Sequence, residues 1–255
     1  MKFGLDDYAH LDSPLHRWEP RCKLIGLMGL IFAFAFVENW QLIPAMLGVT
    51  AGIYALSKLP VTYWMGRLRY PGFFLMGLVV LLPFVSGETI WFKLGILSVY
   101  TEGSLAVVLI GSRFLAIMTL ALVLFGTAEF LTMLKAMRSL GLSPILADMM
   151  LLFYRYLFEV GDRLKTMQTA MRLRGFRPST INRRTLSIFA SLAGTLLVQS
   201  YEQSERIYQA MRLRGYGEAV ATNTRSPVRK ADAIALLFII TLAASFIGAE
   251  LLLVA

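Results

Sequence analysis

Long apolar runs, each bounded by polar or charged residues, dominate the first half of the chain. A helix needs about 20 apolar residues to span a bilayer, and the pattern predicts five spans. They are expected at Leu24–Val37 with an extension to about Trp40, Leu42–Leu59, Pro71–Val85, Ser104–Gly126 and Ala233–Val254. Pro83 is expected to kink or end the third span. Residues 86–103 are mixed, with Ile90–Leu97 as a short interfacial piece.

Residues 127–232 are far more basic, with 16 Lys/Arg against eight Asp/Glu. Apolar positions at helical spacing predict helices at about 128–140, 144–174 and 185–214. The two longer ones are apolar in their first half and amphipathic in their second. The predicted fold is therefore an all-α integral membrane protein with about five transmembrane helices and two or three long cytoplasmic helices. Its segments are 1–126, 127–232 and 233–255.

One six-residue sequence occurs twice near the ends of the two long helices. Ala170-Met171-Arg172-Leu173-Arg174-Gly175 recurs 40 residues later as Ala210-Met211-Arg212-Leu213-Arg214-Gly215, and an aromatic residue follows each copy. Basic residues followed by glycine form a common helix stop. A helix stop does not require the same Ala, Met and Leu in both copies, however, so the repeat indicates a duplicated functional unit.

Helical geometry separates the residues of each copy by face. Met167, Ala170, Met171 and Arg174 share one face, as do Ile207, Ala210, Met211 and Arg214, whereas Arg172 and Arg212 point roughly the opposite way. Each helix thus ends in a small apolar stripe and one arginine, a shape suited to a groove that contains a carboxylate. The candidate partner-binding residues are Ala170, Met171, Arg172, Arg174, Gly175, Ala210, Met211, Arg212, Arg214 and Gly215.

Composition limits the class of protein. Of the 255 residues, 57% are hydrophobic and 16% charged, against about 25% charged in soluble domains. One cysteine, Cys22, excludes a disulfide framework. No phosphate-binding G-x-x-x-x-G-K-[ST] motif occurs, so ATP hydrolysis through that motif is not expected.

The basic residues predict the orientation of the spans. Those near the N-terminus, in the loop after the second span and in 127–232 would share one side, whereas Lys93 would lie alone on the other. By the positive-inside rule the N-terminus and residues 127–232 are cytoplasmic in a multi-pass cell-membrane protein. The net charge of +9 follows this sidedness and is no evidence for nucleic-acid binding.

Several segments together resemble the transmembrane component of energy-coupling factor (ECF) transporters, specifically the CbiQ type of cobalt importers. They are Ser13-Pro14-Leu15-His16-Arg17-Trp18-Glu19-Pro20-Arg21-Cys22-Lys23, Phe153-Tyr154-Arg155-Tyr156-Leu157-Phe158, Ser200-Tyr201-Glu202-Gln203-Ser204-Glu205-Arg206 and the two Arg-Gly helix ends. The resemblance covers nearly the whole chain. The family signature is usually Ala-Arg-Gly or Ala-Arg-Ser, so Leu173 and Leu213 are departures from it.

The resemblance implies a non-catalytic coupling subunit. Each Arg-Gly helix end would engage one of two ABC-type ATPase subunits, and a separate membrane subunit would bind the substrate. Cobalt is the expected substrate, with nickel or a vitamin as alternatives. ATP and magnesium would be used by the partners, so this chain needs no cofactor. The near-identity of the two copies favours an ATPase homodimer.

The remaining ionisable residues indicate no reaction centre. Arg113 lies inside the fourth span, where a structural pair with a carboxylate or with helix-end carbonyls is expected. His10 and His16 are too few ligands for a metal site. Glu38, Glu88, Glu102 and Glu250 are expected at solvated ends of spans.

Two other functions fit the sequence less well. A self-sufficient permease for a cation or small solute needs ionisable residues facing one another within several spans, and only Arg113 fits. A membrane enzyme needs a clustered acid, base or metal constellation. The acidic residues Asp148, Glu159, Asp162, Glu202 and Glu205 lie at helical spacings without a nearby His or Cys.

Overall fold

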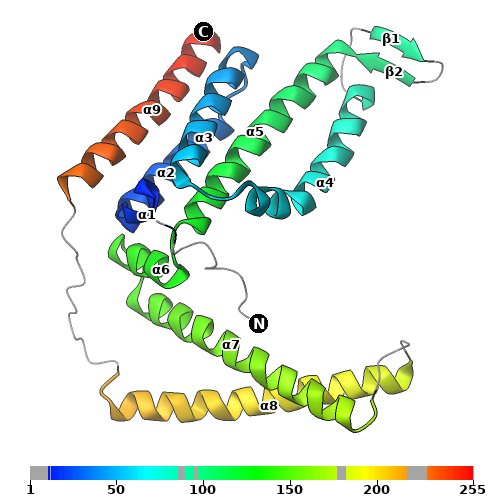
Figure 1. Ribbon diagram of the computed structural model, residues 1–255, viewed down its shortest axis with the longest axis vertical. Helices are drawn as coiled ribbons and strands as arrows, with labels where there is room; N and C mark the ends of the chain where they lie inside the picture. Colours follow the sequence, from blue (N-terminus) through cyan, green and yellow to red (C-terminus); the bar gives the residue numbers. More distant parts are fainter. Residues whose placement is uncertain are drawn as a thin grey trace. The chain divides into compact units, whose positions relative to one another are not determined.

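Helices form most of the computed structural model (Figure 1). It describes residue 11 and residues 13–85, 90–94, 97–176, 182–216 and 229–254. The elements are α1 (Pro14–Arg17), α2 (Pro20–Ala35), the 3₁₀ turn η1 (Trp40–Leu42), α3 (Ile43–Ser57), α4 (Val61–Val85), β1 (Ile90–Leu94), β2 (Leu97–Tyr100), α5 (Thr101–Gly126), α6 (Phe130–Ser139), α7 (Pro144–Leu173), α8 (Arg183–Leu213) and α9 (Lys230–Val254).

Each of the five predicted spans overlaps one helix, although α2 ends at Ala35 rather than near Trp40. Three helical segments are long and apolar enough to cross a bilayer: Trp40–Ser57, Leu105–Gly126 and Lys230–Leu253. Helix α2 has 16 residues, or about 24 Å, which is short of the roughly 30 Å hydrocarbon core. Helix α4 carries Arg67 and Arg69 in its first half. The all-α membrane fold is confirmed, and the count of five spans stays a prediction.

A small hairpin interrupts the helices where only a mixed segment was expected. Strand β1 pairs antiparallel with β2, and Phe92 lies opposite Val99. Aromatic and β-branched residues favour this extended pairing. Helix α4 continues to Val85, two residues beyond Pro83, so this proline stands close to the end of the helix.

The chain divides into two compact units, residues 1–141 with 226–255 and residues 142–225. In the first unit α2 lies at the centre, packed against α5, α6 and α9. Leu27, Leu30 and Phe34 of α2 are fully buried, and the Phe34 ring meets that of Phe246 edge to face, with centroids 5.1 Å apart. Helix α6, although part of the basic segment 127–232, belongs to this unit.

Buried polar contacts fix the two ends of the α2 region. At its start, Lys23 Nζ donates to the carbonyl oxygen of Thr127 (3.1 Å) and to its Oγ1 (3.0 Å). After its end, Asn39 Nδ2 donates to Glu250 Oε1 at 3.0 Å. Glu250 is 7% exposed. The expectation that Glu250 is a solvated end was therefore wrong, because Asn39 satisfies its carboxylate inside the unit.

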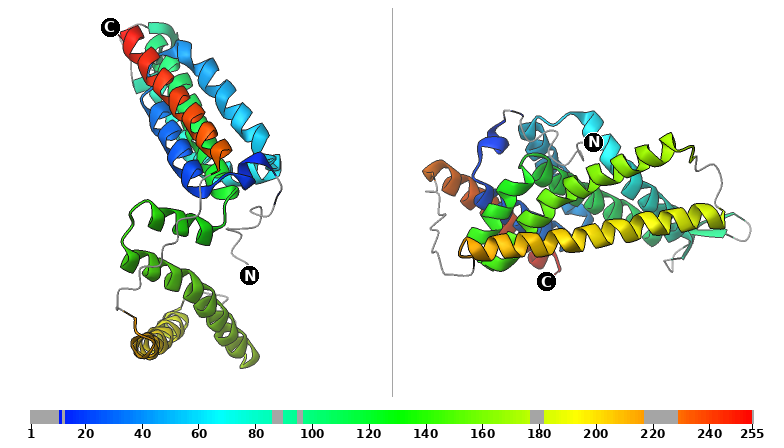
Figure 2. Two further views of the ribbon diagram at one scale, coloured as in Figure 1. Left: turned by 90° about the vertical axis from the view of Figure 1, so that its left-hand side faces the viewer. Right: turned by 90° about the horizontal axis from the view of Figure 1, so that it is seen from below.

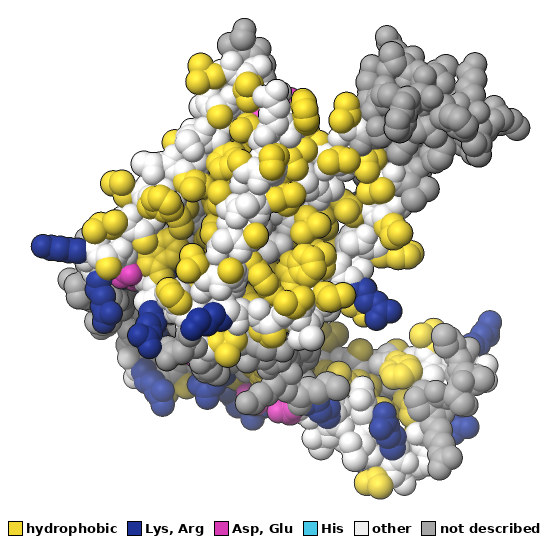
Figure 3. Space-filling model, turned by 45° about the horizontal axis from the view of Figure 1, so that its top comes forward, with side chains coloured by type: hydrophobic (Ala, Val, Ile, Leu, Met, Phe, Trp, Pro, Cys, Tyr) yellow, Lys and Arg dark blue, Asp and Glu magenta, His cyan; other side chains and the backbone are white. Residues whose placement is uncertain are grey.

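Charged and apolar surfaces of the first unit are separated. Hydrophobic side chains cover the outer faces of its helices in Figure 3, and Lys and Arg gather at one end of them. Arg17 precedes α2, Arg67 and Arg69 lie in the first half of α4, and Lys230 begins α9. This separation is typical of a membrane protein with one basic side.

Candidate partner-binding site

The second unit consists of two long helices that run in opposite directions and cross (Figures 1 and 2). Their observed bounds, Pro144–Leu173 and Arg183–Leu213, lie close to the predicted ones. Pro144 stands at the first position of α7, where its missing N–H costs nothing. Because the helices are antiparallel, the two copies of the repeat lie at opposite ends of the pair.

The two copies end their helices with the same backbone cap. In the first, Gly175 N–H donates to the Arg172 carbonyl and Phe176 N–H to the Met171 carbonyl, both at 3.0 Å. In the second, the amides after Arg214 make the equivalent bonds at the same distances. This is the Schellman pattern. It requires the left-handed φ of +83° at Gly175 and +78° at Gly215, which glycine adopts without strain.

Each cap leaves one leucine and one arginine pointing into solvent. Leu173 and Leu213 are 85% and 89% exposed, more than any other large apolar residue that the structure describes. Arg174 and Arg214 are also exposed. The helical pattern predicts these arginines as contacts but not the leucines, although the two copies carry the same leucine at this position. We call Leu173 with Arg174 the first tip and Leu213 with Arg214 the second tip.

The predicted apolar stripe is only partly available to a partner. Met167, Ala170, Met171 and Arg174 do lie together, and they line a shallow groove of about 280 Å³ with Ile188, Ser191, Leu192 and Thr195 of α8. Met167 and Met171 are half-buried, whereas Ala170 is exposed. Ile207, Met211 and Ala210 show the same exposure pattern at the second copy. The methionines thus lie toward the neighbouring helix, and the exposed surface is formed by Ala, Leu and Arg.

The aromatic residue after each cap contacts the other helix. The Phe176 and Phe189 rings meet edge to face, with centroids 6.3 Å apart. The Tyr216 hydroxyl donates a hydrogen bond to Asp148 Oδ2 at 3.2 Å. The two copies of the repeat are 40 residues apart, so the position in α8 equivalent to Asp148 is 188, which is next to Phe189. The pair therefore has an approximate two-fold arrangement in which each end is held by the start of the other helix.

Polar contacts join the middle of the pair. Glu159 Oε1 accepts from Arg163 Nη2 at 2.6 Å and from Gln203 Nε2 of α8 at 3.0 Å. One helical turn away, hydrogen bonding by the Lys165 ammonium at 2.9 Å lowers the pKa of the exposed Asp162 carboxyl below its ordinary value. Glu159 is the polar residue that links the two helices at their centre.

The surroundings of the first arginine in the motif, Arg172 or Arg212, differ between the copies. The Arg212 guanidinium lies over the Tyr208 ring, 5.9 Å from its centroid. The equivalent of Tyr208 in the first copy is Gln168, which offers no aromatic face. Arg172 and Arg212 are both exposed. The two copies thus match in their caps and tips and differ one turn earlier.

The first halves of both helices expose large apolar side chains. No residue of α8, all of which the structure describes, is buried. In α7, Ile145, Met149 and Phe153 are 60%, 59% and 65% exposed, and in α8 Leu186 and Leu197 are 64% and 72% exposed. Apolar surface of this extent marks an interface with a protein or a membrane. The second unit therefore presents an extensive apolar surface to a protein or a membrane.

The remaining predicted residues lie in the first unit. Arg113 Nη2 donates to the carbonyl of Val37, just after α2, while its buried Nε has no hydrogen-bond partner among the described residues. The Oγ of Ser13 lies 2.6 Å from His16 Nδ1, and His10 lies outside the described residues. The part of the chain that the structure describes contains no group of three or more His, Cys, Asp or Glu that could hold a metal.

The fold and site define an all-α integral membrane protein with two identically capped basic helix ends. The chain belongs to the CbiQ family, described as cobalt transport protein, whose model matches residues 12–225. The resemblance to the transmembrane component of ECF transporters is thereby confirmed.

Curated relatives align over most of their length. A protein of Limosilactobacillus fermentum, named energy-coupling factor transporter transmembrane protein EcfT, is 27% identical over 96% of this chain and 97% of its own. Proteins of the same name from Lactococcus lactis and Lacticaseibacillus paracasei are 25% and 27% identical, over 82% and 84% of this chain and 82% and 85% of theirs. These similarities support a membrane location and a transporter component.

Proposed function

We propose that this chain couples two ATPase subunits to a substrate-binding membrane subunit in an ECF-type importer of cobalt ions. The observation that carries the proposal is the pair of identical tips at opposite ends of one helix pair. The first tip lies beside Leu192, and from there 22 residues of α8, or about 33 Å, lead to Arg214. Since a small domain is about 30 Å across, two partner domains fit side by side, one at each tip.

The chemistry of each tip suits a groove with an acidic end. The guanidinium of Arg174 or Arg214 can hold a carboxylate through two parallel hydrogen bonds. The adjacent exposed leucine supplies an apolar anchor, and burying a leucine side chain contributes about 1.5–3 kcal/mol. Because the two tips have the same cap and the same side chains, they fit two equal grooves, which favours an ATPase homodimer.

The helix pair is suited to carrying motion from the ATPases. Each end is held by an aromatic contact to the other helix, through Phe176 and through Tyr216, and Glu159 links the centre to Gln203. When nucleotide binding closes the ATPases, the tips follow their grooves and the helices move as levers. The exposed apolar first halves, around Phe153 and Leu197, then reorient the substrate-binding subunit in the membrane.

The orientation and the substrate complete the proposal. Basic residues at one end of the first unit support a cytoplasmic N-terminus and a cytoplasmic segment 127–232 by the positive-inside rule. The family description as cobalt transport protein supports cobalt rather than nickel or a vitamin. ATP and magnesium belong to the ATPases, and this chain is non-catalytic.

The test is transport by the complete complex in proteoliposomes. We expect ATP-dependent uptake of radioactive cobalt that is lost in the Arg174→Glu, Arg214→Glu double variant. Competition with unlabelled nickel and with a vitamin such as cobalamin identifies the substrate. Uptake by this chain without ATPases would overturn coupling and would support a self-sufficient permease.

A further inference from the structure

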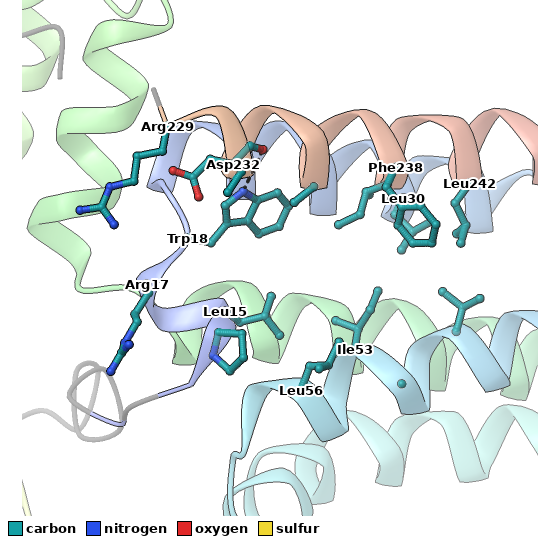
Figure 4. A pocket seen from close by; sticks show the side chains of 16 residues that line it. Leu15, Arg17, Trp18, Leu30, Ile53, Leu56, Arg229, Asp232, Phe238 and Leu242 are labelled. Carbon is teal, nitrogen blue, oxygen red and sulfur yellow. Dashed lines mark hydrogen bonds between the residues drawn. The ribbon is translucent and has the colours of Figure 1, made fainter. Parts of the chain in front are cut away.

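An apolar groove of about 550 Å³ opens between α3 and α9 in the first unit, with α2 at its base. Leu30 of α2, Ile53 and Leu56 of α3, and Phe238 and Leu242 of α9 line its length (Figure 4). We call it the α3–α9 groove. Both helices at its sides contain segments long and apolar enough to span a membrane, so we expect its walls to lie in the bilayer.

The length of the groove corresponds to one leaflet of a bilayer. Along α9 its lining extends from Ala231 to Leu242, a separation of eleven residues or about 17 Å of helix. The hydrocarbon core of a bilayer is about 30 Å thick. The groove therefore starts at the basic end of the unit and reaches roughly to the middle of the membrane.

Charge is confined to one end of this groove. Figure 4 shows Arg17 and Arg229 beyond the apolar residues, with their guanidinium groups on the same side as Asp232. Trp18, 7% exposed, lies between the charged and apolar parts and donates from Nε1 to the Asp232 carbonyl at 3.3 Å. Tryptophan is typical of the membrane interface. The charged side chains that line this end are therefore two arginines and one aspartate.

Gly26 of α2 allows the Trp18 ring to pack closely against the helix. A methyl group on Gly26 would lie 3.2 Å from the Trp18 ring and 3.4 Å from Leu236 of α9. The interfacial end is therefore closely packed. By contrast, a methyl group on Gly52, in the wall of the groove, would meet nothing within 4 Å. The open space thus lies along α3, at the level of Ile53.

We propose that the α3–α9 groove binds one acyl chain of an anionic phospholipid whose headgroup phosphate pairs with Arg17 and Arg229. Guanidinium groups hold phosphate oxygens through paired hydrogen bonds, and the apolar lining suits a hydrocarbon chain. The apolar lining is about as long as one leaflet and the charged side chains lie only at its interfacial end, which matches the hydrocarbon chain and the headgroup of one phospholipid and favours a lipid chain.

The test is native mass spectrometry of the purified full-length chain after equilibration with phosphatidylglycerol or phosphatidylcholine in mixed micelles. Gly52→Leu fills the groove, and we expect it to lower retained phosphatidylglycerol at least fivefold, with Gly52→Ala in between. Gly48→Leu is the matched control, because Gly48 lies one turn earlier on α3 with open space around it and outside the groove lining.

The headgroup contact is tested with a second pair of variants. Each arginine near an anionic lipid surface contributes about fivefold in binding. Arg17→Gln with Arg229→Gln is therefore expected to reduce phosphatidylglycerol retention tenfold or more and phosphatidylcholine retention little. Arg67→Gln with Arg69→Gln on α4 removes the same charge elsewhere and should change neither.

Three results would overturn the proposal. Equal lipid retention by the native chain and Gly52→Leu would show that the groove holds no acyl chain. Equal loss of both lipids in the Arg17 and Arg229 variant would exclude phosphate recognition. Loss of a co-purified membrane protein in Gly52→Leu, with lipid retention unchanged, would assign the groove to a protein helix.

Discussion

The Phe176 ring, just after the end of α7, lies edge to face against the Phe189 ring of α8, with the two ring planes at 80° to one another. At the other end of the helix pair Tyr216 reaches Asp148. An aromatic residue directly after each glycine cap therefore anchors each helix end to its neighbour. This arrangement holds the two tips apart while leaving their leucine and arginine side chains exposed.

The two helix caps are expected to be stable only when the residue at position 175 or 215 adopts a left-handed backbone conformation without strain. Gly175→Ala or Gly215→Ala should destabilise the local cap by about 1–2 kcal/mol, which corresponds to roughly 5- to 30-fold faster hydrogen exchange at the Phe176 or Tyr216 amide. Exchange followed by mass spectrometry or NMR measures this. Gly194→Ala, inside α8, is the control and should slow exchange or leave it unchanged. Unchanged exchange at the capped amides in both variants would contradict the cap.

The exposed leucines are expected to contribute to partner binding and not to folding. Leu173→Ala or Leu213→Ala should weaken ATPase binding by about 10- to 100-fold, the equivalent of burying one leucine. Surface plasmon resonance with immobilised ATPase measures this. Leu197→Ala is the control, because Leu197 is 72% exposed on α8 and belongs to neither tip. If the three variants bind equally well, the leucines are not anchors.

The central contact is expected to be weak and sensitive to salt. Glu159 and Arg163 are 42% and 33% exposed, so each polar contact there contributes only about 0.2–1 kcal/mol. A double-mutant cycle with Glu159→Gln and Gln203→Ala, read by thermal unfolding, should give a coupling energy in this range that falls as salt is added. A coupling energy of zero at low salt would show that Gln203 and Glu159 do not link the helices.

Lys23 is expected to be a structural residue. It is 1% exposed and donates twice to Thr127. Lys23→Met keeps the apolar stem but leaves the Thr127 oxygens unpaired, which should cost about 1–3 kcal/mol. Thermal unfolding in detergent measures this loss. Lys135→Met, at an exposed position of α6, should change stability by less than about 0.5 kcal/mol. A Lys23→Met variant as stable as the native chain would contradict the structural role.

Local signals predicted the long helices and their ends. Pro144 at the start of α7 and Gly175 and Gly215 after the caps are read by rules that involve only neighbouring residues, and the observed helix ends follow them closely. The exposure of Leu173 and Leu213 was missed because a helical wheel shows only which face of a helix a residue occupies. Both leucines are the last residues of their helices, and there no further turn covers a side chain on any face.

Long-range partners could not be predicted. Glu250 is buried because Asn39, 211 residues away in sequence, pairs with it, and Lys23 is buried because Thr127 lies 104 residues away. Neither partner is marked by a local pattern. The hairpin β1–β2 was also missed, since two short apolar segments are equally compatible with an interfacial helix.

The central claim is that each tip binds one ATPase, and the most direct measurement is the mass of the complex without nucleotide. We expect two ATPases per native chain, one for Arg174→Glu or Arg214→Glu, and none for the double variant, because an unpaired charge in a buried contact costs about 2–5 kcal/mol. Arg184→Glu, an equal charge change at the exposed start of α8, should retain two. Two ATPases bound to the double variant would contradict the account.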